Sequence, residues 1–388
     1  MRFPEFTEEW KETKLGKIAE ITKGSGISKD RLSEYGSPCI LYGELYTKYK
    51  SEIINEVYSR TELDSSLLVK SKANDVIIPC SGETAIDIST ARCVPFNNIL
   101  LGGDLNIIRL KNNDGGFFAY QLNGTRKKDI ARVAQGVSVV HLYGENLKHI
   151  RVYHPAIEEQ KKITRLLSLI DKRIATQNKI IEDLKKLKSA ISKQVFAQKP
   201  NEWNRLDTLF SKGKAGGTPT STNKEYYNGV IPFLSINDIT NQGKYVRYTE
   251  NHLSQSGLEN SSAWVVPEYS LIMSMYASVG LVTINEIPIT TSQAMFAMQL
   301  KDKDLLDYLY YYLSYFKYRH IHKYLETGTQ SNINADIVRG IMIPTYGHSR
   351  NMEIASTLQG IDAKIDNELS ILELFNRQKK HLLSQMFI

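Results

Sequence analysis

The stretch IEEQKKITRLLSLIDKRIATQNKIIEDLKKLKSAISKQVFAQ, residues 157–198, contains neither glycine nor proline and repeats apolar residues at alternating steps of three and four. This spacing is typical of the a and d positions of a heptad, so the sequence predicts one long helix that ends before Pro200. At about 1.5 Å per residue such a helix would be roughly 60 Å long, which suits a spacer. Its stripe consists of Leu167, Ile170, Ile174, Ile181, Leu184, Ile191 and Val195, with Gln177 and Lys188 as polar interruptions.

The same apolar stripe returns near the C-terminus at an offset of 191 positions. Polar residues keep this offset too, since Asp171 corresponds to Asp362 and Lys188 to Lys379. Such self-similarity indicates an internal duplication. Two amphipathic helices can bury their stripes on each other, so we predict an intramolecular coiled coil, whose parallel or antiparallel sense the pattern leaves open; two unrelated core helices are the alternative. The second stripe consists of Leu358, Ile361, Ile365, Leu372, Phe375, Leu382 and Met386.

The composition limits the class of protein. A chain of 388 residues suits two to three domains, and 41% hydrophobic with 23% charged residues is typical of a soluble globular protein. No apolar run reaches the roughly 18 residues that a membrane span needs, and the N-terminal MRFPEFTEEW lacks the apolar core of a signal peptide, so we expect a cytoplasmic protein. Cys39, Cys80 and Cys93 show no CxxC spacing, which indicates neither a disulfide framework nor a zinc site.

A similar globular segment precedes each long helix. Each segment begins with a tryptophan, Trp10 or Trp203, followed by a helix-like stretch that ends in glycines, LGKIAEITKG or LDTLFSKGKAGG. Apolar strands follow in the same order, first PCIL and PFLS, then DVIIP and SLIMS, then DLNIIRL and AMFAMQL. Residues 117–131 next match a tyrosine-rich helix predicted at 307–321.

A last strand leads into each long helix, at 149–152 in the first copy and at 340–343 in the second. The order of elements predicts an α+β protein in which two repeated globular domains alternate with two long helices. We place the first domain at 1–155, the first helix at 156–199, the second domain at 200–346 and the second helix at 347–388.

None of the usual catalytic constellations is present in the sequence. There is no GxxxxGK[ST] phosphate loop, and Gly24-Ser25-Gly26 has the wrong spacing to its nearest lysine. His320 and His322 would lie on different faces of a helix, which argues against a metal site. The ExK form of residues 159–161 begins a helix, where acidic residues are ordinary, and no Asp/Asn-Pro-Pro-aromatic loop of an amino-methyltransferase occurs. We therefore expect a non-catalytic chain without a metal or cofactor of its own.

What remains is two β-rich segments with polar and basic turn residues at matching places. The net charge of +7 and the pI of about 9.0 favour a polyanionic partner. Reading duplex DNA requires basic side chains for phosphates and polar side chains for base edges, and although each candidate alone is more often a solvated loop residue, their recurrence favours DNA contact. The first copy offers Lys23, Ser25, Lys29, Arg31, Glu44, Tyr46, Lys48, Ser81, Glu83 and Arg92. The second copy offers Lys212, Lys214, Thr218, Lys224, Asn237, Asp238, Asn241, Gln242, Lys244, Ser274, Tyr276, Ser278 and Gln293.

These residues resemble those of a known family. The pattern P-x-x-E-x-Q-x-x-I followed by L-x-x-I-D-x-x-I, from Pro155 to Ile174, is similar to the conserved region of the specificity (HsdS) subunits of type I restriction-modification enzymes. GGTPTSTNKEYYNG with IPFLSINDI, residues 216–239, resembles the start of a target recognition domain, and TGTQSNIN, residues 327–334, resembles the segment before the family's conserved helix. The chain departs from the pattern at Asn351, where the first copy has a glutamine, and at QGVSV, residues 135–139, where the family's GTQ would fall.

The resemblance implies a fold and a function. It implies two target recognition domains separated by two long helices that pack as an antiparallel intramolecular coiled coil. Each domain would read one half of a bipartite sequence in double-stranded DNA, and the helices would set the spacer and dock two modification (methyltransferase, HsdM) subunits. Restriction (HsdR) subunits would join through the complex, and S-adenosylmethionine, ATP and Mg²⁺ would serve the partner subunits rather than this chain.

Two other classes of function stay open at this stage. One is a coiled-coil scaffold whose globular domains bind protein or glycan, which would show no salt-dependent DNA affinity. The other is a self-sufficient methyltransferase or nuclease, against which the missing catalytic motifs argue.

Overall fold

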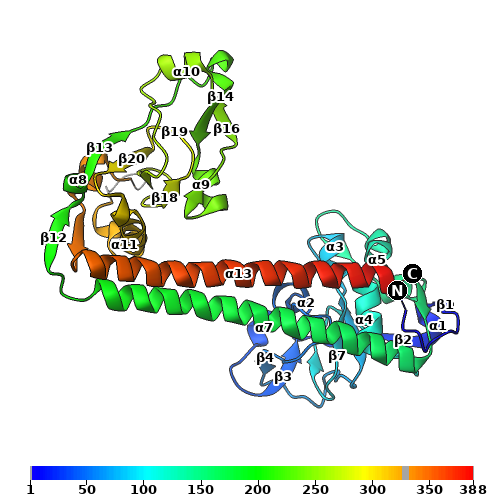
Figure 1. Cartoon of the computed structure of the whole chain (residues 1–388). Coiled ribbons are helices and arrows are strands. Elements are labelled where there is room, and N and C mark those ends of the chain that lie inside the picture. The colour runs from blue at the N-terminus through cyan, green and yellow to red at the C-terminus, as the bar shows by residue number, and fades with distance from the viewer. Residues whose placement is uncertain (1, 326–331, 388) are drawn as a thin grey trace. The chain divides into compact units, whose positions relative to one another are not determined.

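The computed structural model describes residues 2–325 and 332–387, and within it the chain forms two compact units. The first unit contains residues 1–179 and 369–388, and the second contains residues 180–368. Each unit therefore combines one globular domain with parts of both long helices (Figure 1). Part of the segment that resembles the family before its second helix, residues 327–331, lies outside the described residues.

The two long helices are α7, Ile157–Phe196, and α13, His348–Met386. In the first unit the early part of α7 meets the late part of α13, because Leu167 and Leu382 belong to one buried cluster. In the second unit the late part of α7 meets the early part of α13, where Val195 packs on the cluster that contains Leu358. The predicted helices and their mutual packing are confirmed, and the sense that the sequence pattern left open is antiparallel.

The first unit is built on a four-stranded antiparallel sheet with the strand order β2-β9-β5-β7. Strands that lie between β2 and β9 in the chain form a three-stranded sheet with the order β4-β3-β8, in which β3 and β8 run parallel. The strands are β1 Lys11–Lys14, β2 Ala19–Lys23, β3 Ser37–Ile40, β4 Ser59–Thr61, β5 Asp75–Pro79, β6 Ser81–Gly82, β7 Arg92–Val94, β8 Leu100–Leu101, β9 Leu105–Leu110, β10 Val140–His141 and β11 Arg151–His154. The short helices are α1 Leu15–Ile18, η1 Lys29–Arg31, α2 Glu44–Thr47, α3 Ala85–Ile88, α4 Gly115–Asn123, α5 Lys127–Val133 and α6 Gly144–Lys148.

The second unit repeats this plan with a five-stranded sheet, β13-β20-β17-β18-β15, and a three-stranded sheet, β16-β14-β19. Its strands are β12 Glu202–Arg205, β13 Phe210–Ala215, β14 Tyr227–Leu234, β15 Tyr245–Val246, β16 Asn251–Leu253, β17 Leu271–Ser274, β18 Val282–Asn285, β19 Thr290–Thr291, β20 Met295–Leu300 and β21 Met342–Thr345. Its short helices are α8 Leu206–Leu209, η2 Lys224–Tyr226, α9 Ile236–Gln242, α10 Gln255–Glu259, η3 Lys303–Leu305, α11 Leu306–Arg319, η4 Ile321–Lys323 and α12 Ala335–Gly340.

Most strand pairings of the two units correspond, although β6 pairs with β10 only in the first unit and β15 pairs with β18 only in the second, among the residues that the structure describes. In each unit the strand before the first short helix pairs antiparallel with the strand that enters the long helix, as β1 with β11 and β12 with β21. The parallel pair recurs as well, with Cys39 opposite Leu100 in the first unit and Phe233 opposite Thr290 in the second. The internal duplication read from the sequence is therefore a duplication of topology.

Three details of the predicted elements are wrong. The helix-like stretches that end in glycines are helical only over α1 and α8, because the residues after them pair as strands β2 and β13 with β9 and β20. The tryptophans are not equivalent, since Trp10 precedes β1 and packs on Phe117, whereas Trp203 lies within β12. The segment at 117–131 is divided between α4 and α5, because α4 ends at its C-cap residue, Gly124.

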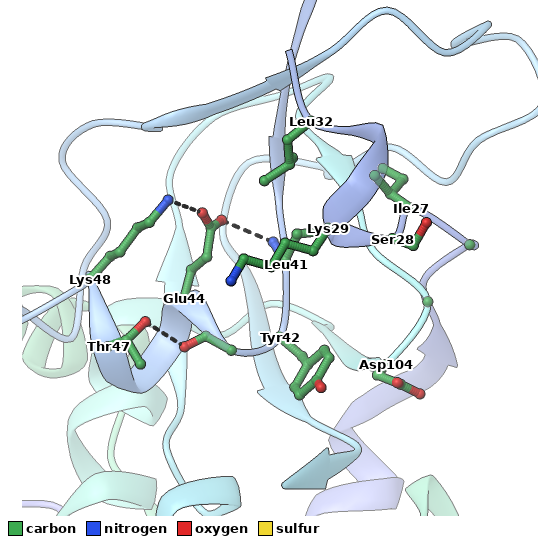
Figure 2. A pocket seen from close by; sticks show the side chains of 13 residues that line it. Ile27, Ser28, Lys29, Leu32, Leu41, Tyr42, Glu44, Thr47, Lys48 and Asp104 are labelled. Carbon is green, nitrogen blue, oxygen red and sulfur yellow. Dashed lines mark hydrogen bonds and ion pairs between the residues drawn. The ribbon is translucent and has the colours of Figure 1, made fainter. Parts of the chain in front are cut away.

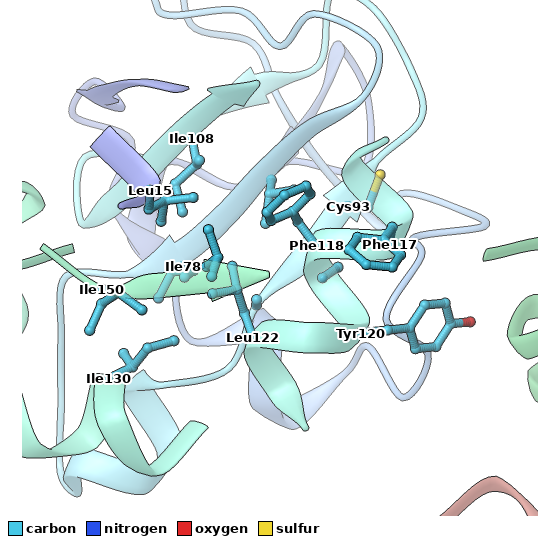
Figure 3. Close-up of a cluster of buried hydrophobic side chains, with 14 of the residues drawn as sticks. Leu15, Ile78, Cys93, Ile108, Phe117, Phe118, Tyr120, Leu122, Ile130 and Ile150 are labelled. Carbon is cyan, nitrogen blue, oxygen red and sulfur yellow. The ribbon is translucent and has the colours of Figure 1, made fainter. Parts of the chain in front are cut away.

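The core of the first unit lies between the main sheet, α4 and the long helices (Figure 3). Phe117 and Phe118 of α4 are fully buried and meet at a ring-centroid distance of 5.4 Å. Ile78 and Ile108 face them from the central strands β5 and β9. Tyr120 belongs to the same cluster, and Figure 3 shows its ring at the edge of the drawn side chains, with the hydroxyl at the far end.

That hydroxyl belongs to a polar triad that links α4 to both long helices. Tyr120 donates a hydrogen bond of 2.7 Å to Asp171 of α7, and Nζ of Lys379 in α13 lies 2.7 Å from the other carboxylate oxygen. Nζ of Lys379 also lies 2.7 Å from the carboxylate of Glu52. Burial alone would lower the pKa of Lys379, but the Glu52 and Asp171 carboxylates outweigh it and raise that pKa. Burial raises the pKa of Glu52.

The second unit carries the same triad at the same offset of 191 positions. Tyr311 of α11 donates a hydrogen bond of 2.8 Å to Asp362 of α13, and Nζ of Lys188 in α7 lies 2.5 Å from the same carboxylate. The polar interruption that the sequence showed at Lys188 is therefore an ion pair between the helices, and the repeat places its counterpart at Lys379.

All three cysteines are buried free thiols, and burial raises the pKa of Cys39 and Cys80 to about 11 and that of Cys93 to about 12. Among the described residues, no helix is apolar over a length sufficient to cross a membrane.

We predict that Lys379→Met lowers the free energy of unfolding by roughly 3–5 kcal/mol, because it leaves Glu52 and Asp171 as buried carboxylates without their cation. The raised pKa of Lys379 means that this contribution is complete below its unfolded pKa of about 10.4 and is lost as the pH rises through the higher folded value. Urea denaturation at pH 7 and at pH 11 measures both effects.

The matched control is Lys188→Met in the second unit. Lys188 is 28% exposed against 16% for Lys379 and faces one carboxylate rather than two, so its loss should cost less. Equal losses of stability for the two variants would contradict the role given to the Glu52–Lys379–Asp171 cluster.

Candidate nucleic-acid interfaces

In the first unit a hairpin leaves the end of β5 and carries two of the predicted residues, Ser81 and Glu83. The backbone fixes its start, because the Cys80 N–H donates to the Asp104 carbonyl at 2.8 Å and the Leu142 N–H donates to the Cys80 carbonyl at 2.7 Å. Ser81 is half-buried and Glu83 is exposed. These side chains therefore stand at a defined edge of the sheet.

The second unit builds the same edge at the end of β17. The Met275 N–H donates to the Ala294 carbonyl at 2.7 Å, and the Ile333 N–H donates to the Met275 carbonyl at 3.0 Å. Tyr276 therefore takes the place that Ser81 has in the first unit, and Ser278 takes the place of Glu83; both Tyr276 and Ser278 are exposed. Residues chosen from the sequence at matching positions thus lie on equivalent hairpins.

In each unit a short helix follows the first strand of the parallel pair, β3 or β14. A carboxylate at the start of this helix accepts a hydrogen bond from a backbone N–H. The Leu41 N–H donates to Glu44 at 3.0 Å in α2, and the Ser235 N–H donates to Asp238 at 2.8 Å in α9, which closes a capping box. Glu44 and Asp238 are only 5% and 1% exposed. Both carboxylates are buried and bonded to the backbone at the start of their own helices, and their contact with DNA stays a prediction.

A cavity of about 700 Å³ opens beside α2 in the first unit. Lys29 and Lys48, two of the predicted residues, line it together with Tyr42 and Asp104, as Figure 2 shows. Lys48 also pairs with the buried Glu44 at 2.6 Å, so its ammonium group is held toward the cavity wall. The cavity therefore combines two cations, a phenol and a free carboxylate on a concave surface.

Aromatic residues connect this cavity to the hairpin of Ser81. A Cβ atom at Gly82 would lie 3.7 Å from the Tyr46 hydroxyl oxygen, which places that hydroxyl over β6. Farther along, His141 stacks on Tyr143 at 6.2 Å between ring centroids, and Nζ of Lys23 lies 6.0 Å from the centroid of the Tyr143 ring. We name the set Lys23, Lys29, Tyr42, Tyr46, Lys48, Ser81, Asp104, His141 and Tyr143 the polar face of the first unit.

A family model for the type I restriction modification DNA specificity domain matches residues 7–186 and again residues 200–374. The chain belongs to this family. Its two matched segments each begin in a globular domain and continue into a long helix, which agrees with the repeat of topology.

Several proteins of known name are similar to the chain. The putative type I restriction enzyme MjaX specificity subunit of Methanocaldococcus jannaschii is 25% identical over 311 residues, which cover 74% of this chain and 71% of that protein. The MjaIX specificity subunit of the same organism is 26% identical over 195 residues, but the match covers 49% of this chain and only 44% of that protein's length. The HindI specificity subunit of Haemophilus influenzae is 32% identical over 113 residues, 29% of this chain and 24% of that protein.

Two solved structures share the fold over almost the whole chain. The S subunit of a type I restriction-modification system from M. genitalium superposes with a TM-score of 0.65 at 15% identity, covering 100% of this chain and 97% of that chain. A chain from a study of complex assembly and conformational transition in the type I R-M system has a TM-score of 0.61 at 16% identity and covers 98% of each chain.

Within the first specificity domain the remaining predicted residues divide into exposed and internal ones. Arg31 is exposed on η1, 3.6 Å from Asp30. Ser25 is half-buried, and its Oγ accepts the Val69 N–H at 2.8 Å, so it holds a loop. Arg92 is 7% exposed and donates to the Leu45 and Tyr49 carbonyls at 3.0 and 2.7 Å.

Two predicted residues of the second specificity domain are also internal. Ser274 is fully buried and donates to the Ser278 carbonyl at 2.8 Å. Lys244 is 11% exposed, lies 2.6 Å from Asp307 and donates to the Tyr311 hydroxyl at 3.2 Å. Arg92 and Ser274 are therefore buried and bonded within their own domains, and Lys244 has a partner inside its own unit. Contact of these three residues with DNA stays a prediction.

The other candidates of the second specificity domain lie at the surface. Lys212 stacks over the Trp264 ring at 4.3 Å, and Lys214 donates to the Ser262 carbonyl at 3.3 Å. The α9 candidates pair locally: Asn237 with Glu250, and half-buried Gln242 with the Tyr248 carbonyl. The exposed remainder comprises Thr218, Lys224, Asn241 and Gln293. The cavity of about 340 Å³ beside α11 is lined by none of these candidates.

Sequence reasoning missed Tyr42, Asp104, His141 and Tyr143. The only signal for them was position, because each lies in a strand or within two residues of one. Among the described residues, no group of three or more histidine, cysteine, aspartate or glutamate side chains is arranged to hold a metal ion.

We predict that Arg92→Met lowers the free energy of unfolding by roughly 1–3 kcal/mol, because the Leu45 and Tyr49 carbonyls lose their donor in a buried site. Arg31→Met is the control, since the Arg31 side chain is 65% exposed and its loss should not change the stability. Thermal unfolding followed by circular dichroism compares the two. An Arg92 variant as stable as the wild type would show that the buried guanidinium is not structural.

Proposed function

We propose that the chain is the DNA specificity subunit of a type I restriction-modification complex, in which each unit reads one half of a bipartite double-stranded sequence. The observation that supports this most is the pair of equivalent hairpins at the ends of β5 and β17, which present Ser81 and Tyr276 at one position of a repeated fold. Different side chains on the same scaffold are what two unlike half-sites require.

The chemistry of the polar face suits duplex DNA. Lys23 and Lys29 offer exposed ammonium groups to phosphates, while Ser81 offers a hydroxyl to base edges. Asp104 is an exposed carboxylate on the same face, and Glu83 is exposed two residues after Ser81; carboxylates accept a hydrogen bond from the N4 amino group of cytosine in the major groove. A surface of cations alone would bind DNA without reading it.

We assign the long helices the spacer and the docking of partner subunits. The matched triads of Tyr120 and Tyr311 place equivalent contacts on α7 and α13, so two copies of a methyltransferase subunit could meet equivalent surfaces. Half-sites on one face of B-DNA lie roughly 34 Å apart or a multiple of that distance, a scale that a pair of long helices can set. In this proposal S-adenosylmethionine, ATP and Mg²⁺ act in the methyltransferase and restriction subunits.

We predict that exchanging residues 1–150 with those of a relative changes one half of the methylated sequence and leaves the other half unchanged. The reason is that all residues of the polar face of the first unit lie within this segment. Single-molecule sequencing of methylated adenines in cells that carry the exchanged gene provides the measurement. If both halves changed, or neither, modular reading by the two units would be wrong.

We also predict that inserting four residues after Lys179 in α7 changes the spacer length of the recognised sequence or prevents assembly. Four residues lengthen a helix by roughly 6 Å and rotate its C-terminal part by more than one turn. The same four residues inserted between Ser65 and Ser66, in a loop of the first unit, serve as the control and should leave the spacer unchanged. An unaltered motif after the α7 insertion would refute the assignment of the spacer to the helices.

A further inference from the structure

The segment where the first copy departs from the family pattern, residues 135–139, belongs to a tight hairpin. The Gln135 N–H donates to the His141 carbonyl at 2.9 Å, and the His141 N–H donates to the Gln135 carbonyl at 2.7 Å. Gly136 has a φ of +117°, and a Cβ there would lie 2.1 Å from the Val139 carbonyl oxygen, so only glycine fits this turn. The tip of the hairpin is therefore held in one conformation by its own backbone.

The hairpin is fixed to the polar face. Its second strand, β10, pairs antiparallel with β6, with Val140 opposite Gly82 and His141 opposite Ser81. The next residue, Leu142, donates its N–H to the Cys80 carbonyl at 2.7 Å. The tip thus projects from the same edge that carries Ser81.

The tip exposes apolar side chains. Val137 is 97% exposed and Val139 is 53% exposed, with exposed Ser138 between them. A single exposed valine is ordinary on a protein surface. Two at the end of a rigid hairpin, next to side chains suited to phosphates and bases, indicate a contact that forms outside this chain.

Cationic side chains are exposed near the residues that precede and follow the hairpin. Lys23 lies over the Tyr143 ring beside the second strand of the hairpin, and on α5 the Arg132 side chain is 77% exposed and Lys128 is exposed. Arg132 lies 3.3 Å from Asp129, but a pair so exposed costs little to rearrange. An apolar tip with cations near its base is compatible with the major groove, in which base edges lie between two phosphate backbones.

We propose that the hairpin of residues 135–141 enters the major groove of the half-site read by the first unit, and that Val137 contacts the C5-methyl group of a thymine there. A two-stranded ribbon fits the major groove, and an apolar side chain is the partner that distinguishes the thymine methyl group. This inference rests on the proposed function and adds to it a residue that determines specificity.

The test uses the full chain assembled with its methyltransferase subunits and a duplex in which deoxyuridine replaces every thymine of that half-site. The replacement removes only the methyl groups, so the wild type should bind roughly fourfold more weakly, the loss expected for one buried methyl. Val137→Ser should bind both duplexes equally. Val230→Ser is the control, since Val230 is 89% exposed in β14 of the second unit and should keep the fourfold preference.

The domain exchange described above separates the two ideas. If that exchange left the methylated sequence unchanged, the proposed function itself would fail. If the exchange changed one half but wild type and Val137→Ser discriminated equally between thymine and deoxyuridine, the inference about Val137 would be overturned. It would also be overturned if Val137→Ser weakened capture of the methyltransferase subunits while the thymine preference stayed intact, because the tip would then be a protein contact.

Discussion

The structure depends on a buried lysine held between carboxylates where two antiparallel helices meet. A lysine removed from water is costly unless an acidic partner faces it, so Lys379 and Asp171 tolerate one register of α7 against α13. A shift of either helix by one turn would separate the two charges, whereas a stripe of leucine and isoleucine alone would tolerate the shift. Tyr120 extends the constraint to α4, because its hydroxyl bonds to the same aspartate. The triad therefore fixes helix register and domain orientation within the first unit together.

The two copies of the triad show which part of the duplicated unit is constant and which part varies. Tyrosine, aspartate and lysine recur at the same offset, yet their surroundings differ. In the first unit Glu52, from a loop, supplies a second carboxylate to Lys379. In the second unit Lys244 reaches the Tyr311 hydroxyl and pairs with Asp307 instead. The helices thus carry the repeated contact, and the loops of each globular domain satisfy the remaining charge in their own way.

The sequence predicted the elements that repeated apolar spacing determines. It missed those for which tertiary strand pairing overrides the local preference for a helix. The long helices, the offset of 191 and the matched strands followed from repeated apolar spacing. The stretch after Leu15 read as a helix because its local composition permits one, but pairing of β2 with β9 in the tertiary structure overrides that preference. The sequence did not separate exposed candidate residues from internal ones for a related reason. Glu44, Asp238 and Arg92 are polar residues near turns, and only the fold shows that each is already bonded to a buried backbone group.

Those internal bonds have a consequence for how a site of this kind can change. Glu44 and Asp238 hold the first turns of α2 and α9 through hydrogen bonds to the backbone. Exposed positions on these helices therefore need not supply those bonds. Asn241 illustrates this, since it is exposed near the end of α9. The same holds at the hairpins, where backbone bonds of Cys80 and Met275 fix the chain and leave Ser81 and Tyr276 free to differ. A scaffold that satisfies its own polar groups from buried positions permits substitution at the surface without loss of stability, and the reading of two unlike half-sites that we propose needs that separation.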